Sequence, residues 1–190
     1  MVIGENVKNA QKTIREISAG IIIYKKDRDG AKFLLLYHGN GYWNFAKGKL
    51  ENSVMAENGA AKFVRESAYR AALREVREET GLNAKDLRFK EFFKVYDRFS
   101  FRRDKDRVFK IVIYYLAETR QSDIKISEEH DGYGWFLYKD AVKLLKYQNL
   151  KDNLKQAYDR VRPKNMQSRQ INPQRQSFNL QKGGASHRPA

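Results

Sequence analysis

The sequence has 190 residues, a formal net charge of +15 and no cysteine. Without cysteine the chain has no disulfides, thiol nucleophiles or cysteine-based zinc sites, which agrees with a reducing compartment. No apolar run approaches the ~18 residues that a membrane span needs. We therefore expect a monomeric, cytoplasmic protein without membrane contact, built as one domain with short extensions.

The first half of the domain is predicted to consist mainly of strands. Residues 1–14 show no firm period and are interpreted as an N-terminal extension. The β-branched run 17–24 predicts a buried strand, and 31–37 predicts a second one. Asn40 and Gly41 then indicate a tight turn before the Trp43–Glu51 segment.

The second half begins with a helix over 67–80. Two strands are predicted at 87–96 and 108–117, with a charged loop over 101–107 between them, and a short strand is predicted at 135–137. Apolar spacing over 138–161 predicts one or two amphipathic helices. This order lacks a βαβ repeat and indicates an α+β domain, which we place at 15–161.

The last segment, 162–190, is predicted to be a disordered basic tail. It has few large apolar residues, too few to bury a core, and it has no acidic residue. Two roles remain open for it, attraction of RNA or another polyanion and simple solubility. Its cations are Arg162, Lys164, Arg169, Arg175, Lys182 and Arg188.

The 67–80 helix is predicted to carry a metal site. Glu75, Glu78 and Glu79 stand at i, i+3 and i+4, so three carboxylates share one face. A hard divalent cation, Mg²⁺ or Mn²⁺, is the natural partner of such a cluster. Arg74 can orient these carboxylates. Ser67 is the expected N-cap, Gly81 is the expected left-handed C-cap, and the expected core stripe is Tyr69, Ala72, Leu73 and Val76.

Taken alone, the three glutamates also fit a solvated helix face balanced by nearby arginines. The wider pattern is more specific, because Arg74 to Leu82 reads Arg-Glu-apolar-x-Glu-Glu-x-Gly-apolar and Glu66 precedes it by seven intervening residues. This pattern resembles the Nudix box of the Nudix hydrolases. The glycine that fits the box is Gly48, which requires an insertion of about a dozen residues within 52–65, expected as a longer loop.

The resemblance implies the Nudix α/β/α sandwich with a mixed sheet, and metal-dependent hydrolysis of a pyrophosphate bond by water. It also implies metal ligation by Glu75, Glu79, Glu78 and the carbonyl of Lys47. Glu66 is a supporting acid that can alternatively pair with an arginine.

Three segments also resemble the asymmetrical diadenosine tetraphosphate hydrolases: Trp43–Glu51, Lys110–Ala117 and Ser127–Trp135. By that resemblance the polyphosphate would contact basic and phenolic side chains, and an adenine would stack between aromatic rings. The residues implied for the substrate are Lys49, Lys110 and Tyr114 for the phosphates, and Tyr133 and Phe99 for the base.

Several alternatives stay open. Tyr133 could cover a sheet edge and Phe99 could anchor a loop. Glu75, Glu128 and Glu129 compete for the role of general base. His130 is interpreted as structural, orienting the Glu129 loop, and a metal role is not expected for it because no second histidine is expected nearby. Other candidate activities are an RNA 5′-pyrophosphohydrolase, a MutT-type nucleotide-pool enzyme and a Nudix-fold RNA-binding module without catalysis.

Overall fold

The computed structural model describes residues 13–57 and 60–162, without the side chains of 53–64. Over these residues a mixed eight-stranded sheet runs in the order β10-β2-β1-β9-β7, with β3 beside β2, β4 beside β1 and β8 beside β9. β1 and β9 are parallel, and the other neighbours are antiparallel. The strands of this sheet are β1 (Thr13–Asp27), β2 (Gly30–Tyr37), β3 (Trp43–Asn44), β4 (Ala46–Lys49), β7 (Arg88–Phe89), β8 (Val95–Arg103), β9 (Asp106–Glu118) and β10 (Gly132–Leu137).

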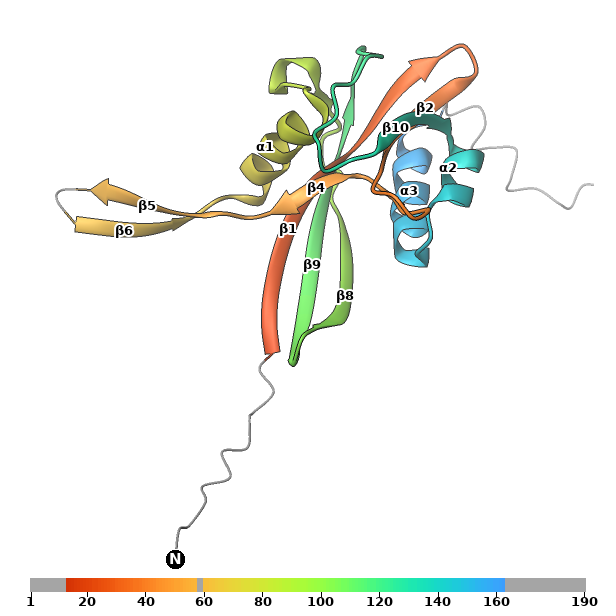
Figure 1. Cartoon of the computed structure of the whole chain (residues 1–190). Helices are drawn as coiled ribbons and strands as arrows, with labels where there is room; N and C mark the ends of the chain where they lie inside the picture. The colour runs from red at the N-terminus through yellow and green to blue at the C-terminus, as the bar shows by residue number, and fades with distance from the viewer. Residues whose placement is uncertain (1–12, 58–59, 163–190) are drawn as a thin grey trace, which may run out of the picture.

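Helices cover both faces of the sheet (Figure 1). In the part of the chain that the structure describes they are α1 (Ala68–Thr80), α2 (Tyr138–Leu144) and α3 (Gln148–Val161), with a 3-10 turn at Ala84–Asp86. Alternate residues of β1 supply two cores: Ile21 and Ile23 pack with α1, and Ile22 and Tyr24 pack with α2 and α3. The predicted α/β/α sandwich with a mixed sheet is confirmed.

Two strand boundaries differ from the prediction. The charged 101–107 segment is not a loop: β8 continues to Arg103 and β9 begins at Asp106, with Asp104 at the turn in a left-handed conformation. Six charged residues follow Phe101 in this segment, and five of them are exposed, so paired strands carry consecutive charges here without burying them. The predicted 87–96 strand is interrupted, because only Arg88–Phe89 pairs before β8 begins at Val95.

The insertion before Glu66 is a β-hairpin and not a loop. Its strands β5 (Asn52–Glu57) and β6 (Ala60–Arg65) form a separate two-stranded sheet, in which Asn52 faces Arg65. Figure 1 shows this hairpin projecting away from the large sheet. The insertion therefore adds an element and leaves the register of α1 unchanged.

The predicted ends of the chain fall mostly outside the described residues. β1 starts at Thr13, so the last two residues of the expected extension belong to a strand. Of the expected basic tail only Arg162 lies in the described part, so the structure does not test the disorder expected there. No described helix is long and apolar enough to cross a membrane.

Candidate metal and nucleotide site

The ends of α1 are fixed by the predicted caps. Ser67 Oγ accepts a hydrogen bond from the Arg70 N–H at 3.3 Å, and Gly81 ends the helix with φ 74°. Ala72 and Val76 are fully buried, as expected for the core stripe. The expectation for Tyr69 is wrong: its side chain is 44% exposed, because it lies at the margin of the stripe against Phe89.

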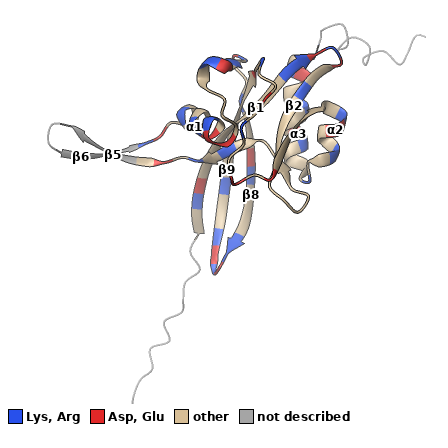
Figure 2. Ribbon diagram, turned by 45° about the horizontal axis from the view of Figure 1, so that its top comes forward, with Lys and Arg blue, Asp and Glu red and all other residues tan. Residues whose placement is uncertain are grey.

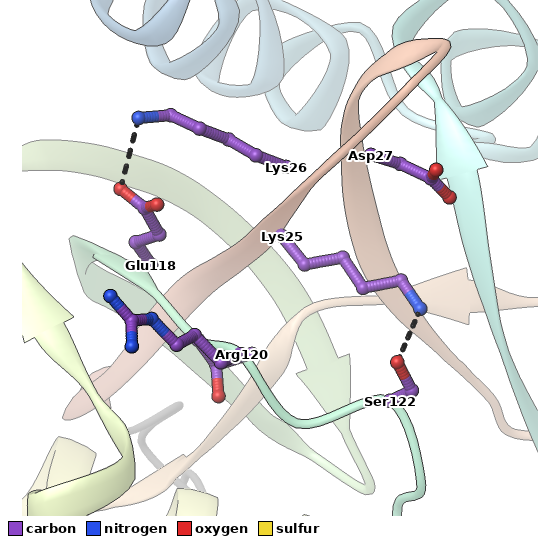
Figure 3. Close-up of a pocket in the computed structure, with 7 residues that line it drawn as sticks. Lys25, Lys26, Asp27, Glu118, Arg120 and Ser122 are labelled. Atoms are coloured by element: carbon purple, nitrogen blue, oxygen red, sulfur yellow. Dashed lines mark hydrogen bonds and ion pairs between the residues drawn. The ribbon is translucent and has the colours of Figure 1, made fainter.

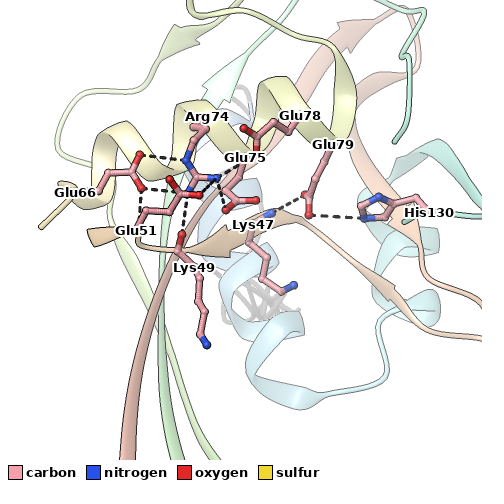
Figure 4. A network of polar contacts seen from close by, with 9 residues as sticks. All are labelled: Lys47, Lys49, Glu51, Glu66, Arg74, Glu75, Glu78, Glu79 and His130. Atoms are coloured by element: carbon pink, nitrogen blue, oxygen red, sulfur yellow. Dashed lines mark hydrogen bonds and ion pairs between the residues drawn. The ribbon is translucent and has the colours of Figure 1, made fainter. Parts of the chain in front are cut away.

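Arg74 is the centre of the carboxylate cluster (Figure 4). Its Nη1 donates to Glu75 Oε1 at 2.8 Å and to Glu78 Oε2 at 3.0 Å. Its Nε and Nη2 donate to the two oxygens of Glu66 at 3.2 and 3.0 Å, and Nη2 also reaches the Lys49 carbonyl at 2.8 Å. Arg74 thus contacts the carboxylates that it was predicted to orient, and Glu66 forms the arginine pair that was its alternative role.

Glu79 lies between α1 and the edge of β4. The Lys47 N–H donates to Glu79 Oε2 at 2.8 Å. Burial raises the pKa of Glu79 to about 7, although this hydrogen bond and the charge of Lys47 oppose the shift. Because the N–H and carbonyl of one strand residue point to the same edge, the Lys47 carbonyl also faces the carboxylate cluster.

Gly48 makes room for Glu75. A Cβ atom built at Gly48 would overlap the carboxyl group of Glu75. Burial raises the pKa of Glu75, and Arg74 opposes that shift. The assignment of Gly48 as the glycine of the box therefore has a physical reason, since only glycine lets the strand approach this carboxylate.

The donor set fits a hard divalent cation. Carboxylate and backbone carbonyl oxygens are the ligands that Mg²⁺ and Mn²⁺ prefer. Burial raises the pKa of Glu79 to about 7, because the charged carboxylate is poorly solvated there. A bound cation would stabilise that charge, so the site favours cation binding. As the described residues stand, no three acidic or imidazole groups surround one point closely enough to hold a metal ion. Arg74 bridges Glu75 and Glu78, so cation binding would require these side chains to turn.

Two histidines border the carboxylates. The ring of His38 lies 4.4 Å from the ring of His130, so the expectation that no second histidine is near was wrong. His130 Nε2 lies 3.8 Å from Glu79 Oε1, and Ser127 Oγ holds its Nδ1 at 3.0 Å. Burial lowers the pKa of both rings, that of His38 to about 4, so both are neutral at pH 7.

Two of the candidate general bases, Glu128 and Glu129, follow β9 and differ in their surroundings. The charge of Glu129 raises the pKa of both Glu75 and Glu79, so Glu129 lies within electrostatic range of the cluster. Glu128 is an exposed residue of the same turn. Electrostatic proximity therefore favours Glu129 over Glu128 as a group that could reach water at the site.

A second group of charges lies on the sheet face that carries α3. Glu16 is 6% exposed and accepts Arg103 Nη1 at 2.6 Å and Lys49 Nζ at 3.0 Å. Burial lowers the pKa of Lys110, and the charge of Lys47 lowers it further. In the described part of the chain neither Lys110 nor Lys47 has a side-chain ion pair, so both ammonium groups could take an anion.

The predicted aromatic residues do not form one pocket. Tyr114 is fully buried, with its OH 3.4 Å from Asn44 Oδ1, so a direct contact with phosphate would require the core to open. Phe99 pairs with Lys110 on the α3 face. Tyr133 stands opposite Leu36, whose side chain belongs to the α1 core, so it lies on the other face of the sheet. Tyr133 and Phe99 therefore cannot enclose the same base, and the expected pair is corrected.

The sequence analysis did not single out Tyr42 and Tyr147, two aromatic residues that contact each other near the buried Tyr114. Their rings meet edge to face at 6.0 Å, and Tyr147 is 50% exposed. Tyr42 also accepts a hydrogen bond from Asn44 Nδ2 at 2.7 Å, close to the buried Tyr114. The one available signal was that Tyr42 directly precedes the Trp43–Glu51 segment.

A surface hollow lies elsewhere, at the far end of β1 and β9 (Figure 3). Two of its cations already have partners: Lys26 Nζ lies 3.5 Å from Glu118 Oε2, and Lys25 Nζ donates to Ser122 Oγ at 3.0 Å. None of the sequence-predicted site residues lines it. We therefore place the site at the carboxylate cluster. The hollow is lined by Lys25, Lys26, Asp27, Glu118, Thr119, Arg120 and Ser122.

Replacing Arg74 by alanine should destabilise the fold. The change leaves Glu66 and Glu75 crowded and partly buried without their cation, which should cost about 1–3 kcal/mol of the free energy of unfolding. Urea unfolding of Arg74→Ala and of Arg77→Ala, an exposed arginine on the same helix, measures the difference. Equal midpoints would show that Arg74 does not organise the cluster.

The pairing of Glu66 predicts a dependence of stability on pH. Burial raises the pKa of Glu66, but Arg74 and the Glu51 N–H outweigh it, so the folded-state pKa lies below the unfolded one. The contribution is therefore complete above about pH 4.3, the unfolded value, and is lost as pH falls through the folded pKa. The melting temperature of Glu66→Gln should lie below that of the wild type at neutral pH, and the gap should close in acid. A constant gap would contradict the pairing.

The chain is similar to proteins of known family over most of its length. The NUDIX domain family model matches residues 14–159. The mouse asymmetrical bis(5′-nucleosyl)-tetraphosphatase is 29% identical over 151 residues, covering 74% of this chain and 92% of that protein. Its pig counterpart is 30% identical over 155 residues with the same coverage. A crystal structure of a C. elegans Ap4A hydrolase binary complex superposes with a TM-score of 0.58 at 26% identity, over 74% of this chain and 93% of that one.

The chain belongs to the Nudix family of pyrophosphohydrolases. The family match covers most of the chain and includes the carboxylate helix, Gly48 and the strands that position them. The suspected likeness to asymmetrical diadenosine tetraphosphate hydrolases is confirmed at about 29% identity. Members of this family generally use divalent metal ions.

Proposed function

We propose that this Nudix hydrolase cleaves a pyrophosphate bond of dinucleoside polyphosphates such as diadenosine tetraphosphate. One observation carries the proposal: Lys47 and Lys110, which have no side-chain ion pair among the described residues, lie close enough that the charge of Lys47 lowers the pKa of Lys110, and the Lys47 N–H donates to Glu79 at the edge of β4. A chain of phosphates could contact both lysines while it reaches the carboxylates. The relatives whose names include a nucleosyl tetraphosphate match 74% of this chain.

In this proposal Glu75, Glu78, Glu79 and the Lys47 carbonyl would hold Mg²⁺ or Mn²⁺. When bound, the metal ion supplies neutralisation of phosphate charge and acidification of water. Arg74 positions Glu75 and Glu78 through contacts of 2.8 and 3.0 Å. Glu75 or Glu129 accepts the proton of the attacking water, and the pKa of Glu75, raised by burial, suits that task.

The test is a substrate panel with Mg²⁺. It compares diadenosine tetraphosphate, 5′-triphosphorylated RNA and nucleoside triphosphates by kcat/KM, with chelator as the control. We expect the dinucleotide to be turned over fastest. A higher kcat/KM for triphosphorylated RNA or for a nucleoside triphosphate would replace the proposed substrate, and no turnover of any of them would favour a binding module.

Replacing Lys110 by alanine should lower kcat/KM for the dinucleotide by about 10- to 150-fold, the value of a hydrogen bond to a charged group. Lys139→Ala, which removes an exposed lysine of α2, is the matched control. Inorganic pyrophosphate inhibition should weaken in parallel, because Lys110 contacts phosphate and not base. Unchanged kinetics in Lys110→Ala would remove this lysine from the substrate site.

A further inference from the structure

A three-stranded arm projects past the helices. It consists of residues 13–17 of β1, 96–103 of β8 and 106–111 of β9, which pair along their length. Figure 1 shows these strand ends extending together beyond the body of the sheet. No helix of the described chain has its core contacts there, because the two cores lie further along the strands. The α3 side of the arm is partly covered, because Glu16, Asp97 and Val108 are buried and Asn149 of α3 donates to Asp97. The opposite side carries exposed side chains.

Side-chain alternation separates the charges of the arm by face. The side of the arm that continues the α3 face of the sheet carries Glu16, Asp97 and Asp106. Arg103 lies on this side too and pairs with Glu16. The positions of the opposite face carry no acidic residue. We call this opposite side the basic face. Its cations are Arg15, Arg98, Arg102 and Arg107, all exposed and, among the described residues, without an acidic partner.

Two of these arginines oppose each other. Arg102 and Arg107 are cross-strand partners in the β8–β9 hairpin. Like charges directly opposite are destabilising, so this pair weakens the hairpin unless an anion lies over it. Figure 2 shows Lys and Arg at this end of β8 and β9, with acidic residues at the turn between the strands. The charge pattern therefore fits a polyanion rather than an internal ion-pair network.

Aromatic rings lie among the cations of the same face. Tyr96 is 43% exposed, with the Arg98 guanidinium 4.8 Å from its ring. Lys94 Nζ lies 5.6 Å from the ring of Tyr115, and Tyr115 meets the exposed Tyr69 of α1 edge to face at 5.6 Å. Cations that track a backbone, interleaved with rings on which bases can stack, are typical of surfaces for single-stranded nucleic acid.

The basic face leads toward the carboxylate cluster. The Ile17 carbonyl, two residues after Arg15 on β1, accepts the Leu50 N–H at 3.1 Å. The neighbouring Lys49 carbonyl accepts Arg74 Nη2. Tyr69, at the other margin of the face, stands on the helix that carries Glu75. A strand lying on the basic face would thus come close to the site without occupying it.

We propose that the basic face of the arm binds single-stranded nucleic acid. The phosphates contact the four arginines, and bases stack on the exposed rings of Tyr96 and Tyr69. This surface is separate from the lysines of the α3 face that we assign to small substrates. Binding therefore does not depend on hydrolysis and can be measured without metal.

The test is fluorescence anisotropy of a labelled single-stranded RNA of about 15 nucleotides with the full chain. Arg102→Gln with Arg107→Gln should weaken binding about tenfold or more at 0.1 M salt and reduce the log-log salt slope by about 1.4, two phosphate contacts at ~0.7 each. The matched control, Arg28→Gln with Lys139→Gln, removes the same charge from exposed sites elsewhere. Both double variants retain residues 163–190, so any contribution of that segment cancels.

The outcomes separate the alternatives. Equal affinities of the two double variants would overturn the proposal, since only net charge would matter. Tyr96→Ala should weaken RNA binding roughly five- to hundredfold but leave a duplex of the same length almost unaffected, because only unpaired bases can stack. An arm that binds phosphatidylserine vesicles and not RNA would also overturn it. The Arg102/Arg107 variant should melt no lower than the wild type and should hydrolyse small nucleotides at the wild-type rate.

Discussion

Glu79→Gln should reduce kcat by about 10²–10⁴-fold without loss of the fold, the range associated with losing one acid–base or metal-holding group. Glutamine keeps an oxygen for the Lys47 N–H, so the contact between α1 and β4 survives. It loses the negative charge that attracts the cation. Steady-state hydrolysis with Mg²⁺, together with Mn²⁺ titration calorimetry, measures both consequences.

Stability provides the second measurement on the same variant. Burial holds the folded-state pKa of Glu79 at about 7, above its unfolded value. Without metal the protonated form is therefore favoured by folding, and that stabilisation is lost as pH rises through 7. The neutral Gln variant avoids this loss, so above pH 7 apo Glu79→Gln should melt at or above the wild-type temperature. Glu91→Gln, an exposed carboxylate in a turn, is the control. Full activity in Glu79→Gln, or wild-type activity in chelator, would contradict the assignment.

Local sequence signals predicted the carboxylate helix well. Its caps, its apolar period and its charge spacing all arise within one segment, so 67–81 could be interpreted without knowing the rest of the chain. The exposure of Tyr69 could not be interpreted in this way. A residue at the margin of a helical stripe is buried or exposed according to what lies above it, and here the neighbouring ring is Phe89, from a distant strand.

Features that depend on strand pairing were beyond local patterns. Alternation shows that Tyr133 and Trp135 share a face, but only the register with β2 shows that this face belongs to α1. The contact of His38 with His130 requires two loops that are far apart in sequence. Only the pairing of Arg102 with Arg107 shows that the arm carries arginines that have no acidic partner in the described part of the chain.

Gly48→Ala should abolish most activity while the fold persists. The added methyl group would overlap the Glu75 carboxyl group, which is the far end of a flexible side chain. Because that end can turn away, α1 and β4 need not separate, but Glu75 must leave its place beside Arg74. We expect kcat/KM to fall by about 10²–10³-fold, since misplacing a positioned group can cost that much. The melting temperature should change by only a few degrees.

Two other glycines make this prediction specific. In Gly20→Ala the new methyl group would overlap the backbone carbonyl of Ala46, which cannot turn away, so that variant should lose stability as well as activity. In Gly132→Ala the nearest atom is Tyr37 Cβ at 3.9 Å, an ordinary contact, so both properties should stay near wild type. Wild-type activity in Gly48→Ala would show that Glu75 works equally well from another position. Unfolding of Gly48→Ala would show that the close approach of β4 to α1 is needed for the fold. The loss of activity would then be a consequence of the lost fold and not of a displaced Glu75.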